Sequence, residues 1–121
     1  MPEIADRKQF AKDLEKRTRI FAVQIIRLSS ALNHTPECLV IRNQITKSGT
    51  SIGANYREAN RARSKADFKN KIAICESAAS ETQYWLEVIR ELAWLPGNDL
   101  KADYEECGEL LAIFTSIGKP R

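Results

Sequence analysis

Six basic side chains fall within fifteen residues near the middle of this chain, and they form its one candidate site. They are Arg57, Arg61, Arg63, Lys65, Lys69 and Lys71. Only Glu58 and Asp67 oppose them, which leaves a net charge of +4 over residues 57–71. Guanidinium and ammonium groups at this density are typical of surfaces that bind the phosphates of RNA or DNA. The alternative is a solvated turn whose charges pair with acidic residues of the same or a neighbouring chain.

The position of two of these lysines favours a ligand over a purely structural role. Arg61 and Arg63 lie near the expected end of one helix, where cations complement the helix dipole. Lys65 and Lys69 lie at the expected start of the next helix, where a cation opposes the dipole by ~0.3–1 kcal/mol. The only aromatic residue in the run is Phe68, which helical spacing assigns to the core. Binding should therefore be led by phosphate contacts, without base stacking or sequence readout.

Residues for catalysis, metal binding or cofactor binding are not assembled in this sequence. His34 is the only histidine, and it lies in a polar turn, so the serines have no partner for a hydrolase triad. Glu58, Glu76 and Glu81 lack the Glu-x-x-His spacing of carboxylate metal sites in helical bundles. We therefore expect no enzymatic activity, no metal and no cofactor.

Apolar residues recur with helical spacing along the whole chain, and the alternation typical of strands is absent. A first helix is expected over about residues 6–32, with an inward stripe of Leu14, Thr18, Phe21, Ile25, Leu28 and Leu32. A second helix is expected over about residues 36–62. Thr35 suits its N-cap and Pro36 its first position, because a proline lacks the N–H that would have no partner there. Its inward stripe is Ile41, Ile45, Ser48, Ile52, Tyr56 and Ala59.

Two further helices complete the expected fold. Ser64 followed by Asp67 resembles a capping box and predicts a third helix over about residues 65–95. Its stripe is Phe68, Ile72, Cys75, Ala79, Thr82, Leu86, Ile89 and Ala93. The segment 96–99 must end it, and a fourth helix is expected over about residues 99–117. Short turns make consecutive helices antiparallel, so the pattern predicts an all-α, up-down-up-down four-helix bundle.

Four small residues lie close together on the second helix: Ser48, Gly49, Gly53 and Ala54. Each glycine should weaken an isolated helix by ~1 kcal/mol relative to alanine. Neither belongs to a phosphate-binding glycine motif, because no strand precedes them and no Gly-Lys-Ser/Thr follows. We expect the four small residues to let another helix backbone approach closely. The alternative is a loop across residues 48–53.

Length and composition limit the class of protein. The 121 residues allow one domain, residues 1–121, with one core. No run of about 18 apolar residues predicts a membrane span, and the first ten residues lack the apolar segment of a secretory signal. Cys38, Cys75 and Cys107 lie far apart, as expected for reduced thiols. We therefore expect a cytoplasmic protein without membrane contact.

Charge and apolar residues are distributed in a way that favours self-association. Residues 1–75 carry 15 Lys and Arg against 7 Asp and Glu, whereas residues 76–109 carry 2 against 9. Such polarity can hold the two halves together, orient neighbouring subunits or give one end a positive field. Several apolar residues lie off the core stripes and predict an outer patch of the kind found at subunit interfaces. They are Ile20, Val23, Ile26, Ile74, Trp85, Val88, Leu92, Trp94 and Ile113.

Two segments around the basic run resemble a known family. SGTSIGANYREA (residues 48–59) and RARSKADF (residues 61–68) are similar to the bacterial "four helix bundle protein" family, and a looser likeness extends over about residues 13–117. That family includes proteins encoded by intervening sequences in 23S ribosomal RNA genes and the accessory variability protein of diversity-generating retroelements.

The resemblance implies a cytosolic bundle that assembles into a homopentameric ring. For the retroelement member it also implies nucleic-acid binding through a basic surface and a reverse-transcriptase partner. Arg57, Arg61, Arg63 and Lys65 fall on the basic positions of the motif, and Gly49, Ser51, Gly53 and Asn55 on its small-residue face. We expect low-specificity RNA or DNA binding; the alternative is a protein-interaction scaffold without nucleic-acid binding.

Overall fold

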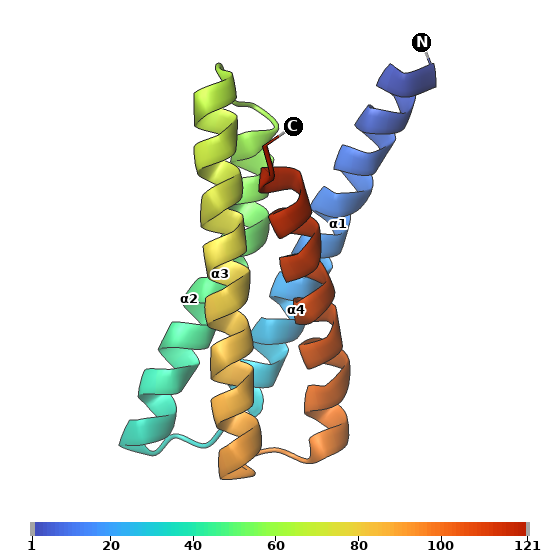
Figure 1. Cartoon of the computed structure of the whole chain (residues 1–121). Helices are drawn as coiled ribbons and strands as arrows, with labels where there is room; N and C mark the ends of the chain where they lie inside the picture. The colour runs from blue at the N-terminus through green and yellow to red at the C-terminus, as the bar shows by residue number, and fades with distance from the viewer. Residues whose placement is uncertain (1, 121) are drawn as a thin grey trace.

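Four α-helices make up the part of the chain that the computed structural model describes, which is residues 2–120 without the side chains of residues 2–4 and 97–99 (Figure 1). The helices are α1 (Pro2–Ala31), α2 (Pro36–Ala59), α3 (Lys65–Leu92) and α4 (Gly97–Gly118). No strand occurs in this range, so the predicted all-α four-helix fold is confirmed. None of the helices, as far as their residues are described, has the length and apolarity that a bilayer crossing requires.

The helices pack as a square in which each backbone lies against its two neighbours. α1 and α3 each contact α2 and α4, whereas the backbones of the diagonal pairs stay apart. Short turns make successive helices antiparallel (Figure 1). The turn between α2 and α3 therefore lies at the same end of the bundle as the start of α1 and the end of α4 (Figure 1).

The core is built from the stripes that helical spacing predicts. Every stripe residue expected in the first helix is buried. Polar stripe residues have partners, since the buried Thr82 hydroxyl donates to Ser48 Oγ at 2.8 Å. The rings of Tyr56 and Phe114 meet edge to face across the diagonal between α2 and α4, with centroids 5.4 Å apart. These contacts join all four helices around one core.

The helix starts are set by the residues expected to cap them. Thr35 Oγ1 accepts a hydrogen bond from the Cys38 amide at 3.2 Å, with Pro36 as the first helical residue of α2. Ser64 Oγ accepts from the Asp67 amide at 3.0 Å and begins α3. Both predicted N-caps are confirmed.

The end of α2 differs from its predicted bound. α2 stops at Ala59 rather than near residue 62, because the Arg61 and Ala62 amides donate to carbonyls three residues earlier, at 3.0 and 3.1 Å. Hydrogen bonds of this 3₁₀ type tighten the chain into a turn. A helix continuing to residue 62 would place Arg61 on the same face as Arg57, four residues earlier. Because α2 ends at Ala59, Arg61 does not continue that face.

Three other bounds also shift. α3 ends at Leu92 rather than near residue 95, because Ala93 adopts a left-handed conformation with φ 54°. Ala93 is exposed as a result and does not extend the core stripe. α1 begins at Pro2 instead of near residue 6, and a proline suits a first helical position. α4 begins at Gly97, two residues earlier than expected, with Pro96 at its N-cap.

Two glycines bring α2 close to α1. The helix is continuous through residues 48–53, which excludes the loop alternative. A β-carbon on Gly49 would lie 2.7 Å from Ile25 Cγ2, and one on Gly53 would lie 3.0 Å from Thr18 Oγ1. A side chain at either position would push the two helices apart, so the predicted close approach is confirmed for both glycines.

The other two small residues have different surroundings. Ser48 faces α3, where its hydroxyl accepts from Thr82. Ala54 is exposed and lines the outer groove between α1 and α2. Successive residues turn about 100° around a helix, so Ala54 is offset from Gly53 toward solvent. The expectation that Ala54 permits a close helix contact stays a prediction.

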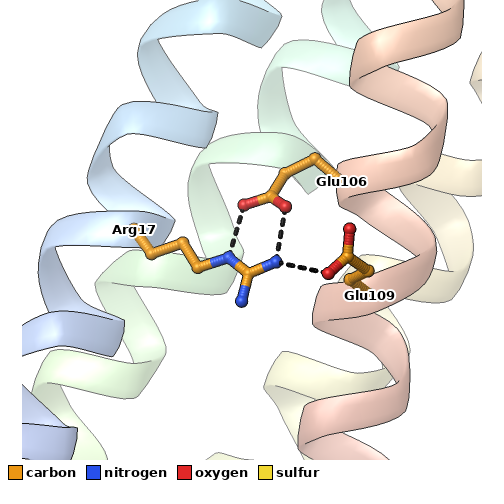
Figure 2. Close-up of polar contacts among 3 residues, drawn as sticks. All are labelled: Arg17, Glu106 and Glu109. Atoms are coloured by element: carbon orange, nitrogen blue, oxygen red, sulfur yellow. Dashed lines mark hydrogen bonds and ion pairs between the residues drawn. The ribbon is translucent and has the colours of Figure 1, made fainter.

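The contact between α1 and α4 is the smallest of the four, and these helices diverge toward the start of α1 (Figure 1). A cluster of charged side chains crosses between them (Figure 2). Arg17 donates two hydrogen bonds to Glu106, at 2.7 and 2.6 Å, and one to Glu109 at 3.1 Å. The two hydrogen bonds that Arg17 donates to the Glu106 carboxylate raise the pKa of Arg17, so the guanidinium stays charged.

The apolar residues outside the stripes do not form one continuous patch, contrary to expectation. Trp85, Trp94 and Ile113 are partly buried and pack against the core. The exposed members are Ile20, Val23 and Ile26 on α1 and Ile74 and Leu92 on α3. Because α1 and α3 occupy diagonal corners of the bundle, these two groups lie on different sides of the molecule.

Replacing Gly49 by alanine should destabilise the protein by about 1–3 kcal/mol, although alanine is the better helix former, because the new methyl group overlaps Ile25. Gly108→Ala is the matched control. A β-carbon there would lie 3.5 Å from Gln83 Nε2, an ordinary contact, so this variant should gain about 0.5–1 kcal/mol. Urea unfolding of both variants measures the difference. Equal effects of the two substitutions would refute the close α1–α2 contact.

Arg17→Met should lower the free energy of unfolding by about 1 kcal/mol at low salt, because it removes the ion pairs between α1 and α4 while keeping most of the side-chain stem. High salt screens such a partly exposed cluster, so the deficit should shrink in 1 M NaCl. Lys12→Met, on the same helix and without an ion pair to any described residue, is the control for lost charge. A deficit of the same size for both variants would contradict the role of the cluster.

Candidate nucleic-acid interface

The six basic residues predicted as a site surround the turn between α2 and α3. Arg57 lies in the last turn of α2, and Arg61 and Arg63 lie in the turn itself. Lys65 and Lys69 belong to the first two turns of α3. These five side chains are exposed, whereas Lys71 is half-buried farther along α3. The structure therefore gathers five of the six at one end of the bundle.

The backbone of this turn is held by hydrogen bonds on both sides. The Asn60 amide donates to the Tyr56 carbonyl at 3.1 Å and closes α2. The Phe68 amide donates to the Ser64 carbonyl at 3.0 Å and, with the Ser64 cap, opens α3. Only the three residues 61–63 separate the caps Asn60 and Ser64, so the basic side chains project from a short, fixed connection.

Arg57 differs from the other basic residues because a carboxylate accompanies it. Its Nε lies 3.8 Å from Oε1 of Glu15 on α1, and the other oxygen of Glu15 accepts a hydrogen bond from Asn60 Nδ2 at 2.9 Å. Glu15 thus ties the end of α2 to α1. The sequence offered no signal for this contact, since 42 residues separate Glu15 from Arg57.

The remaining basic residues of the site have no carboxylate partner within the described part of the chain. No ion pair or side-chain hydrogen bond joins any of Arg61, Arg63, Lys65 or Lys69 to another described residue. Asp67 is the nearest acid along the chain, and its backbone amide, rather than its carboxylate, makes the cap contact with Ser64. Intramolecular pairing, the structural alternative for these charges, therefore applies to Arg57 alone.

Three of these cations surround one surface hollow of about 420 Å³. Its lining residues are Ala62, Arg63, Ser64, Lys65, Phe68 and Lys69. The Phe68 ring is half-buried and packs against the core, so it forms part of the floor and does not stand free to stack on a base. An apolar floor rimmed by three cations is suited to a phosphate of a flexible strand, held by charge and not by shape.

A further cation lies at this end and was not included among the predicted site residues. α4 ends beside α3, where a β-carbon on Gly118 would lie 3.6 Å from Ile72. Lys119 follows directly and is exposed. It lies 48 positions beyond Lys71, the last residue of the basic run, so only the folded chain brings it to the same end.

Metal ligands and thiols were the other candidates for a reactive site among the described residues. No group of three or more His, Cys, Asp or Glu side chains among them is placed to hold a metal ion. Cys75 and Cys107 are buried, and their thiols donate to the carbonyls of Ile52 and Ala79 at 3.4 and 3.3 Å. Burial raises the pKa of both thiols to about 12, which disfavours the reactive thiolate.

Comparison with known proteins identifies a family and solved structures that this chain resembles. The profile of the family described as "23S rRNA-intervening sequence protein" matches residues 12–116. A crystal structure from Bacteroides thetaiotaomicron, described as a protein with unknown function from the S23 ribosomal protein family, is similar to this chain at 37% sequence identity and a TM-score of 0.81. The match covers 88% of this chain and 98% of that one. No curated protein matches.

The raised thiol pKa values predict slow alkylation. Iodoacetamide at pH 8 should leave Cys75 and Cys107 unmodified in the folded protein and label both in denaturant, as measured by peptide mass spectrometry. Rapid labelling of the folded protein at pH 8 would contradict the burial.

The same shift in thiol pKa makes alkali destabilising. Above about pH 9 the unfolded chain releases thiol protons that the folded chain retains until about pH 12, so the free energy of unfolding falls with rising pH.

Proposed function

The chain belongs to the 23S rRNA-intervening sequence protein family, and we propose that it is a non-enzymatic, self-associating helical bundle that binds the phosphate backbone of RNA or DNA. The binding surface is the end of the bundle formed by the α2–α3 turn. The observation that carries this proposal is the hollow lined by Arg63, Lys65 and Lys69, three cations without a carboxylate partner among the described residues.

Lys65 and Lys69 carry positive charge at the start of α3, where it opposes the helix dipole. Asp67 lies in the same turn and offsets part of this cost, but no ion pair joins it to either lysine. A phosphate in the hollow would be attracted both by the cations and by the amides at the start of the helix. Because no free aromatic ring accompanies them, affinity would come from charge and would depend little on base sequence.

Self-association would strengthen this weak contact. Several copies in one particle present several basic ends, and binding of one end raises the effective concentration of the next. A pentamer is the form that the family resemblance implies, and a reverse transcriptase is one partner that it implies. In our proposal the particle acts in the cytoplasm, where it meets RNA.

A second candidate function is a protein-interaction scaffold without nucleic-acid binding. The acidic half of the chain favours it, because residues 76–109 carry 2 Lys and Arg against 9 Asp and Glu and would repel a polyanion. The two functions differ in their response to salt and to charge reversal at the basic end.

Reversing Lys65 and Lys69 to glutamate should lower affinity for a single-stranded oligonucleotide by about tenfold or more at low salt, and should reduce the log–log salt slope by about 0.7 for each lost phosphate contact. Both changes place acids near the start of α3, which the helix dipole favours, so the fold should survive. Fluorescence anisotropy over a salt series measures both quantities.

The matched control is Lys47→Glu with Lys101→Glu, the same change of charge at exposed positions away from the α2–α3 turn. It should retain most of the binding. If the wild-type protein binds neither single- nor double-stranded nucleic acid at low salt, nucleic-acid binding is refuted and the scaffold function remains. An equal loss in the control would show that net charge, and not the basic end, is responsible.

A further inference from the structure

An apolar strip runs along the outer face of α1. Ile20, Val23 and Ile26 are 49%, 41% and 45% exposed, although α1 buries its whole core stripe on the opposite face. Cations flank the strip, and all of them are exposed: Lys16, Arg19 and Arg27. Three branched apolar side chains within two helical turns, bordered by cations, form a surface suited to an apolar groove with an acidic rim.

A groove of that kind lies between α3 and α4, with a volume of about 630 Å³. Its lining residues are Ala73, Glu76, Ser77, Ser80, Glu81, Tyr84, Leu111 and Thr115. Small residues form much of its wall, so a helix can approach closely, while Tyr84 and Leu111 supply apolar surface. Neither Glu76 nor Glu81 forms an ion pair with a described residue, and no cation lines the groove.

We infer that the α1 strip of one copy packs into the α3–α4 groove of a second copy. This inference rests on the self-association proposed above and names its two surfaces. Lys16, Arg19 and Arg27 then meet Glu76 and Glu81, which brings the basic half of one chain against the acidic half of the next. The contact is heterologous, because each copy uses its strip toward one neighbour and its groove toward the other.

The two surfaces lie at the same level along the bundle. Gly53 touches Thr18 on α1, and the adjacent Ile52 carbonyl accepts from Cys75 on α3. Gly49 touches Ile25 on α1, and the adjacent Ser48 accepts from Thr82. Residues 18–25 of α1 are therefore level with residues 75–82 of α3.

Strip and groove lie on different sides of the bundle, since α1 and α3 occupy diagonal corners. One copy can therefore contact two neighbours at once, one through each surface.

Mixing two variants tests the pairing of these surfaces. The strip variant is Ile20→Glu with Val23→Glu, and the groove variant is Glu76→Lys with Glu81→Lys. Each should fall to single chains of 13.7 kDa by light scattering, with an unchanged circular dichroism spectrum, because three of the four side chains are exposed and Glu76 is half-buried. An equimolar mixture should form a dimer of twice that mass, since one intact groove and one intact strip remain.

A charge-swapped chain provides a second measurement. Lys16→Glu and Arg19→Glu combined with Glu76→Lys and Glu81→Lys reverses both surfaces, so assembly should return relative to the groove variant alone. Absence of a dimer on mixing, with both variants folded, would overturn the heterologous pairing. If both variants keep the oligomeric mass of the wild type, the interface lies on other surfaces.

Failure of this inference and failure of the proposed nucleic-acid binding are distinguishable. Neither variant changes the α2–α3 turn, so each single chain should still bind an oligonucleotide, at lower avidity. The Lys65→Glu, Lys69→Glu protein should keep the oligomeric mass of the wild type. A wild-type mass of 13.7 kDa at every concentration would overturn self-association itself, whatever the outcome of the binding assay.

Discussion

The close approach of α1 and α2 is the contact on which the rest of the bundle depends. Two glycines, one helical turn apart, remove the side chains that would separate the helices. Their absence lets Ile25 and Thr18 occupy that space, and it brings Glu15 within reach of the end of α2. α3 packs on the adjacent face of α2 through Ser48 and Thr82. One segment of α2 thus positions both neighbouring helices.

Electrostatics acts differently in the middle of α1 and at the α2–α3 turn. Near the middle of the helix, Arg17 is engaged by two carboxylates of α4 and supports the smallest helix contact. At the α2–α3 turn most of the cations have no such partner among the side chains that the structure describes. Charges of the first kind hold the fold together, whereas charges of the second kind leave their field directed at solvent and available to a polyanion.

The fold was largely predictable because its determinants are local or periodic. The spacing of Leu14 through Leu32 identified the inward face of α1, and Thr35 and Ser64 identified two helix starts. What could not be predicted depends on contacts between distant segments or on local backbone geometry. The pairing of Glu15 with Arg57 leaves no pattern in sequence. In the turn after Ala59 the backbone hydrogen bonds change from the four-residue spacing of an α-helix to a three-residue spacing, and no proline or glycine marks the change. Basic residues indicated the candidate site, but only the structure separates the paired Arg57 from the others.

The position of Glu15 makes it an internal competitor for the candidate site. A phosphate at the turn would find several cations open, whereas at Arg57 it would compete with a carboxylate. Short or sparsely charged ligands would leave Arg57 where it is, whereas a dense polyanion would recruit it. The bond from Asn60 to the other oxygen of Glu15 would then be left to hold α1 against the end of α2. Occupancy at the tip would in this way loosen one corner of the bundle.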